Sequence, residues 1–152
     1  MSRVDPIASV SIHEAGHAVM MKVVGVRVES LRIDRDCIDS GEGTQGETQH
    51  GACEITREAH AKVIVAGVVA ESIAFGGCPV RRLNKIGDGD ELDTIMEESG
   101  IPKRERAAER RRIIGIVDKR LRKHFDHVVA IAEEVGTYDT CDATTVNRIM
   151  RT

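Results

Sequence analysis

Two histidines and a glutamate in this sequence are spaced so that they could hold and use a metal ion. They are His13, Glu14 and His17, in the pattern H-E-x-x-H. In an α-helix, residues four apart lie about one turn apart on the same face, so both imidazoles could reach one ion. Zinc accepts neutral nitrogen ligands at about 2.0–2.1 Å. Glu14 would project beside the ion, where it could take a proton from a zinc-activated water and pass it to a leaving amine.

The residues around this motif predict the helix that it needs. Asp5 can cap the first turn, Pro6 suits the first helical position, and Gly25 can end the helix. Apolar residues recur between them at helical spacing. A chance H-E-x-x-H on a solvated helix would need no such apolar flanks, so this context favours a metal site.

An open zinc site needs a third protein ligand, and the residues alone leave several candidates. Glu71 interrupts an apolar stretch, where an ionised carboxylate is costly without a partner. Four carboxylates lie at the start of a later predicted helix, where favourable interaction with the helix dipole would also explain them. These four are Asp88, Asp90, Glu91 and Asp93. His50 and His60 are further candidates, although surface positions would explain both.

The segments after the first helix predict a small β element followed by more helices. Residues 26–34 alternate apolar and polar side chains, which indicates a strand with one buried face. We expect this strand to line the cleft and to offer its edge to an extended substrate. Residues 36–51 hold four glycines and predict a loop that borders the site, with a short returning strand near Thr48. A second helix, apolar on every side and therefore central, is predicted from about Thr56 to Phe75.

Helices dominate the rest of the chain. A loop is predicted over residues 78–89 and a short helix over 90–99. Pro102 opens a long helix whose apolar stripe continues to Val135, and a last short helix covers about 142–150. The predicted fold class is therefore mainly α (α+β), in a single domain of residues 1–152.

Composition and charge argue against two classes of function, nucleic-acid binding and membrane association. Aromatic residues make up only 2% of the 152 residues, which favours a helical core of small and aliphatic side chains. Residues 103–123 carry ten basic and three acidic side chains, but no aromatic residue interleaves them, so nucleic-acid binding is not favoured. No apolar stretch approaches the roughly 20 residues of a membrane span, no signal peptide is evident, and the four cysteines form no close pairs. We therefore expect a soluble, cytoplasmic protein without membrane contact.

Four segments resemble one known family. Residues 12–19, I-H-E-A-G-H-A-V, resemble the zinc helix of the FtsH-type ATP-dependent metalloproteases. Residues 46–49, G-E-T-Q, are similar to that family's G-Y-T-Q segment, and residues 66–76 to its G-G-R-x-A-E-E-x-x-F-G helix. Residues 87–92, G-D-G-D-E-L, fall where the family has G-A-S-N-D-L. The order and approximate spacing agree over residues 7 to about 96.

The resemblance implies a zincin-like helical metallopeptidase fold and a set of site residues. His13 and His17 would bind Zn²⁺ and Glu14 would be catalytic. Alignment on Leu92 gives the family's third ligand, an aspartate, to Glu91, with Asp90 as the nearest aspartate. Glu71 matches a family glutamate and would orient a ligating histidine.

The resemblance covers only the family's protease domain, because the sequence contains no Walker A motif. It implies a zinc-dependent metalloendopeptidase that hydrolyses peptide bonds in a peptide or protein substrate. It is also compatible with a homo-oligomer and with an ATPase partner acting in trans. The alternative is a non-catalytic, metal-binding interaction or regulatory module derived from the same fold.

Overall fold

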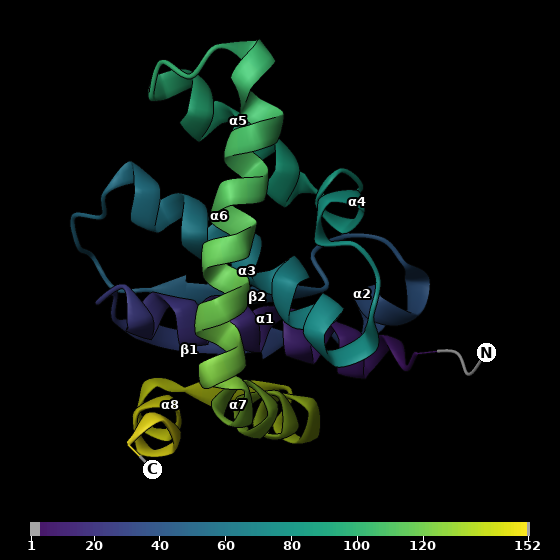
Figure 1. Ribbon diagram of the computed structural model, residues 1–152. Coiled ribbons are helices and arrows are strands. Elements are labelled where there is room, and N and C mark those ends of the chain that lie inside the picture. Colours follow the sequence, from purple (N-terminus) through teal and green to yellow (C-terminus); the bar gives the residue numbers. More distant parts are fainter. Residues whose placement is uncertain (1–3, 152) are drawn as a thin grey trace.

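A computed structural model describes residues 4–151, and in this part of the chain it contains eight helices and one small sheet (Figure 1). The fold is mainly helical α+β, as the sequence predicts. The helices are α1 Pro6–Val23, α2 Arg35–Ser40, α3 Arg57–Phe75, α4 Pro79–Leu83, α5 Gly87–Glu98, α6 Lys103–Lys123, α7 Phe125–Tyr138 and α8 Ala143–Met150. The strands are β1 Val28–Ile33, β2 Gly46–His50 and β3 Thr140–Asp142.

Helices α1 and α3 form the centre of the molecule. The Asp5 side chain accepts a hydrogen bond from the Ile7 amide, and Pro6 occupies the first turn of α1, so the predicted start is confirmed. Thr56 caps α3 in the same way through the Ala59 amide. The two helices pack directly on each other, and their facing side chains belong to one continuous core. The central position predicted for the second helix is therefore confirmed.

The three strands form an antiparallel sheet in the order β2-β1-β3. Leu31 on β1 pairs with Thr48 on one side and with Cys141 on the other, so β1 has a hydrogen-bonded neighbour along both edges. The expectation that β1 would offer an edge to substrate is therefore wrong. Within the described chain, the edge strands are β2 and β3, and the sequence indicated β2 only as a short return near Thr48.

The long helix predicted from Pro102 to Val135 is two helices. The chain turns at His124, which ends α6 and precedes α7, and Figure 1 shows α6 and α7 running in different directions. The apolar stripe continues through the break because each half has its own packing partner: α6 lies on α3, whereas α7 lies on α1. No glycine or proline marks the turn.

Smaller elements also depart from the expectations. The glycine-rich segment contains α2, which begins where the Asp34 carboxylate accepts a hydrogen bond from the Cys37 amide. The loop predicted over 78–89 contains α4, and α5 begins at Gly87, three residues earlier than expected. That earlier start places Asp88 in the first turn of α5. No helix among residues 4–151 is long and apolar enough to cross a membrane.

Candidate metal centre

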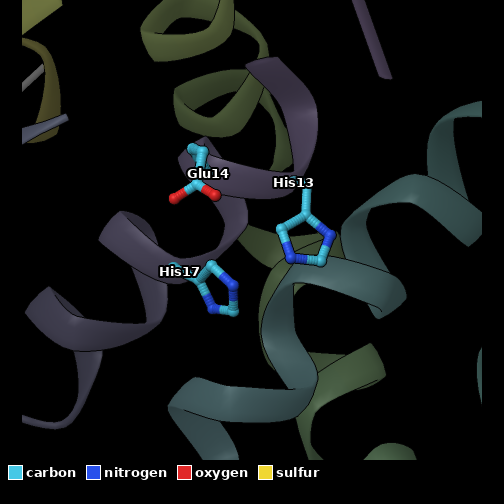
Figure 2. Close-up of side chains that lie close together, drawn as sticks. All are labelled: His13, Glu14 and His17. Atoms are coloured by element: carbon cyan, nitrogen blue, oxygen red, sulfur yellow. The ribbon is translucent and has the colours of Figure 1, made fainter. Parts of the chain in front are cut away.

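The first helix presents both histidines of the motif to one side. Figure 2 shows His13 and His17 projecting from α1 with their rings close together and Glu14 beside them. The ring centroids lie 4.6 Å apart, and the planes meet at 81°. One nitrogen from each ring and one carboxylate oxygen of Glu14 all lie within 4.8 Å of one another, so this group could hold a metal ion.

A second carboxylate, from Asp88 on α5, also lies close to the two rings. Its Oδ2 atom is 3.0 Å from His13 Nε2 and 3.5 Å from His17 Nε2. Ligand atoms around a tetrahedral zinc ion with bonds of about 2.0–2.1 Å are separated by about 3.3 Å. The two observed separations lie on either side of that value. The donor set of two imidazole nitrogens and one carboxylate oxygen therefore fits zinc in both chemistry and spacing.

The other nitrogen of each ring is held by the protein. His17 Nδ1 lies 2.7 Å from the Val63 carbonyl oxygen, so it must carry the hydrogen and donate it. His13 Nδ1 lies 2.5 Å from Glu71 Oε1. Because both Nδ1 atoms are engaged, both Nε2 atoms face the position between the rings and Asp88. Such outer contacts are what fixes the orientation of metal-binding histidines.

Glu71 is itself fixed by two further groups. Its Oε2 atom accepts hydrogen bonds of 3.0 Å from the Ser9 hydroxyl and from Arg82 Nη1. The sequence resemblance implies that Glu71 orients a histidine, and the structure places it on His13. The resemblance gave no indication that Ser9 and Arg82 would contact Glu71, because they lie 62 and 11 residues from it along the chain.

Glu14 is held by strand β2. Its side chain is only 7% exposed, and its Oε2 atom accepts a 2.6 Å hydrogen bond from the Thr48 hydroxyl. The same hydroxyl lies 3.1 Å from the Glu14 carbonyl oxygen. Thr48 therefore fixes the glutamate beside the two imidazoles rather than between them. The G-E-T-Q segment contained this signal, although the sequence alone did not assign Thr48 a role.

Opposite charges dominate the electrostatics of the cluster. Burial would lower the pKa of His13, but hydrogen bonds to Asp88 and Glu71 and the charge of Glu14 raise it to about 10. Burial would raise the pKa of the Asp88 carboxyl, yet hydrogen bonds with His13 and His17 hold it well below its usual range. His13 is therefore protonated at neutral pH in this arrangement. A metal ion at Nε2 would have to displace that proton.

Glycines make the close approach of the elements possible. A Cβ atom at Gly67 on α3 would lie 2.5 Å from His13 Cε1 and Nε2, so the imidazole lies directly on the backbone of α3. A Cβ atom at Gly46 on β2 would lie 2.8 Å from Glu14 Cγ. Gly16 allows α1 to cross α3, since a Cβ atom there would lie 2.6 Å from the Ala66 carbonyl oxygen.

The cluster opens into a pocket of about 470 Å³. One side is formed by β2, including Gly46 and Thr48, and another by α3 and α5. The apolar part of the lining is Met21, Val26, Ile55, Val63 and Ile64. A glycine-rich segment bordering the site was expected, and its β2 portion does so.

The other sequence candidates lie further from the two imidazoles. Glu91 contacts His60, with Oε1 3.2 Å from Nε2, and both line the pocket. Asp90 is exposed, and Asp93 forms a 2.6 Å ion pair with Arg110 on α6. His50 bonds through Nδ1 to the Gly51 carbonyl oxygen. The structure thus brings Asp88, rather than Asp90 or Glu91, to His13 and His17.

Comparison with protein-family models finds no family that matches this chain, and comparison with curated proteins finds no match. The resemblance to the FtsH-type proteases therefore stays a prediction.

Proposed function

We propose that this protein is a zinc-dependent peptidase in which His13, His17 and Asp88 bind the metal and Glu14 is the general base. The observation that carries the proposal is the position of Asp88. Its Oδ2 atom faces both Nε2 atoms at 3.0 and 3.5 Å, while the Nδ1 atoms are occupied by other partners. Two histidines and one carboxylate form a known type of catalytic zinc site, which keeps one position open.

Zinc in such a site polarises a carbonyl oxygen and lowers the pKa of a water molecule to about 7. The chain's own part of the reaction is proton transfer by Glu14. Its carboxylate takes a proton from the attacking water as the new C–O bond forms. It then delivers a proton to the amide nitrogen as the C–N bond breaks. Thr48 supports this role because its hydroxyl holds one carboxylate oxygen at 2.6 Å and fixes the side chain without neutralising it.

The pocket supports a peptide as substrate. Strand β2 combines a free edge with residues that line the pocket, so an extended peptide could pair with β2 through main-chain hydrogen bonds. The five apolar side chains in the lining would accept an apolar residue near the cleaved bond. A zincin-like fold, a homo-oligomer and an ATPase partner in trans are further proposals, and they rest on the sequence resemblance alone.

The test compares wild-type protein with Glu14→Gln for zinc content by elemental analysis and for cleavage of a library of unstructured fluorogenic peptides. We expect one zinc per chain in both proteins, and a loss of at least about 1,000-fold in cleavage rate for the variant, since the base is removed and the ligands stay. Glu97→Gln, an exposed position on the same protein, is the matched control and should cleave like wild type.

Two outcomes would contradict the proposal. Equal cleavage by wild type and Glu14→Gln would show that Glu14 is not the base. One zinc per chain with no cleavage by either protein would favour the non-catalytic metal-binding module instead.

A further inference from the structure

The first turn of α5, which carries Asp88, lacks two local features that usually fix the start of a helix. Ile86 stands at the N-cap position, and its apolar side chain cannot accept a hydrogen bond from the first amides of the helix. The turn also contains Gly87 and Gly89, and glycine is the least favourable helix residue after proline. The position of Asp88 therefore depends on contacts that other elements make with this turn.

Arg110 of α6 supplies such contacts on both sides of the turn. Its Nη1 atom donates a 2.7 Å hydrogen bond to Oδ1 of Asn84, the residue that ends α4. Its Nη2 atom lies 2.6 Å from Asp93 Oδ1 and 3.4 Å from the Gly89 carbonyl oxygen, both on α5. The Arg110 side chain is only 13% exposed. Because the guanidinium is planar and its donors point in fixed directions, it fixes the three groups relative to one another.

The contact at Gly89 is one residue away from the metal centre. Gly89 directly follows Asp88, so a displaced Gly89 carbonyl would displace the Asp88 backbone as well. On its other side, Gly89 packs against α4, where an added Cβ atom would overlap the Leu83 carbonyl oxygen. Distances from zinc to its ligands vary by only about 0.2 Å, so a small shift of this turn would take Asp88 out of range of an ion held by His13 and His17.

We propose that Arg110 is a positioning residue for the metal centre, holding the first turn of α5 so that Asp88 faces His13 and His17. This inference rests on the metal-binding part of the proposed function. It adds a residue from α6, a helix from which no described residue lines the pocket of the metal centre. Arg110 touches neither the ion nor the substrate. Its positive charge alone would weaken the binding of a metal cation, whereas positioning Asp88 strengthens it, so the two effects have opposite signs.

The experiment measures zinc affinity by competition with a chromophoric chelator. The test variant is Arg110→Ala, and the matched control is Arg111→Ala, which removes the same charge from the neighbouring exposed position. We expect the affinity of Arg110→Ala to fall about 10- to 100-fold and that of Arg111→Ala to stay within about twofold of wild type. Asn84→Ala changes no charge and removes one of the three contacts, so a smaller loss of about two- to tenfold is expected.

Two further measurements separate positioning from a general loss of stability. The absorption spectrum of the protein loaded with Co²⁺ in place of zinc depends on the ligands and their geometry. It should change in Arg110→Ala and stay the same in Arg111→Ala. In the metal-free protein, hydrogen exchange of the amides of residues 87–93 should become faster in Arg110→Ala, while the amides of α1 keep their wild-type protection.

Several results would overturn the inference. One is a zinc affinity of Arg110→Ala that equals or exceeds that of Arg111→Ala, because loss of charge would then be the only effect. An unchanged Co²⁺ spectrum, or loss of protection throughout the chain, would show that Arg110 supports only the fold. Should Arg110→Ala fail to fold, Arg110→Lys carries the test, since it keeps the charge and loses the planar pair of donors. Wild-type zinc affinity in that variant would equally overturn the inference.

The same titration separates this inference from the proposed peptidase function. Failure of the wild type to bind zinc would remove both. Zinc binding without peptide cleavage would remove the peptidase function and leave the role of Arg110 intact, whereas cleavage with unchanged zinc affinity in Arg110→Ala would remove only the role of Arg110.

Discussion

The contact between His13 and the backbone of α3 predicts that Gly67→Ala will damage the metal centre. The added Cβ atom would lie 2.5 Å from Cε1 and Nε2 of the His13 ring. Carbon atoms in favourable contact are about 3.5–4.0 Å apart, so the ring or the helix must move by about 1 Å. A ring displaced that far cannot keep both its 2.5 Å contact with Glu71 and its 3.0 Å contact with Asp88.

The expected effect on folding is small, and the expected effect on metal binding is large. Forcing a methyl group into a packed interface costs about 1–3 kcal/mol. Replacing glycine by alanine within a helix returns about 1 kcal/mol, so the net loss of stability should be about 0–2 kcal/mol. Misplacing a ligand's supporting contact commonly reduces metal affinity 10- to 100-fold, and we expect a loss in that range for Gly67→Ala.

The assay is a competition titration of zinc against a chromophoric chelator, together with thermal unfolding in excess chelator. Gly115→Ala is the matched control, because Gly115 lies within α6 and an added Cβ atom there meets nothing within 4 Å. It should keep wild-type zinc affinity and gain up to about 1 kcal/mol of stability. Wild-type zinc affinity in Gly67→Ala would refute the placement of the His13 ring on α3.

Three further results are expected. Asp88→Asn should lower zinc affinity at least about 100-fold, whereas Asp90→Asn, at an exposed position, should leave it unchanged. If the chelator titration showed the loss for Asp90→Asn and not for Asp88→Asn, Asp90 would be the third ligand. Because the pKa of His13 is raised to about 10, zinc should displace one proton when it binds near neutral pH, and its affinity should fall about tenfold for each unit by which the pH is lowered. Calorimetry in buffers of different ionisation enthalpy would measure the proton release, and a release of zero protons would contradict the prediction. Thr48→Val should reduce kcat about tenfold at unchanged zinc content, because Glu14 loses its 2.6 Å hydrogen bond, and an unchanged kcat would argue against that support.

Local rules predicted the first helix and its two histidines well. The cap at Asp5, the proline after it and the H-E-x-x-H spacing all act within α1, so sequence neighbours contain the needed information. The break at His124 was missed because the stripe on both sides has the same period. Only the different partners of α6 and α7 distinguish one long helix from two.

The third ligand could not be chosen from the sequence for a similar reason. Asp88 and Glu91 lie three residues apart and therefore on one face of α5. Which of them meets His13 depends on the position of α5 along α3, and the two choices differ by a shift of about 4.5 Å. That distance is set by packing between helices, which no local pattern describes.

The separation of 75 positions between His13 and Asp88 gives metal binding a consequence for the timing of assembly. An ion bound by both residues would close a loop that contains β1, α2, β2, α3 and α4. Closing this loop costs conformational entropy, and the packing of the folded core must already have offset that cost before the ion binds. During synthesis, α1 and its histidines emerge long before α5. Tight uptake of metal should therefore wait until residues up to 98 are made and docked, and would then stabilise the chain by about 4 kcal/mol at a free concentration 1,000 times the Kd. The ion would therefore stabilise a fold that has already formed and would not nucleate folding.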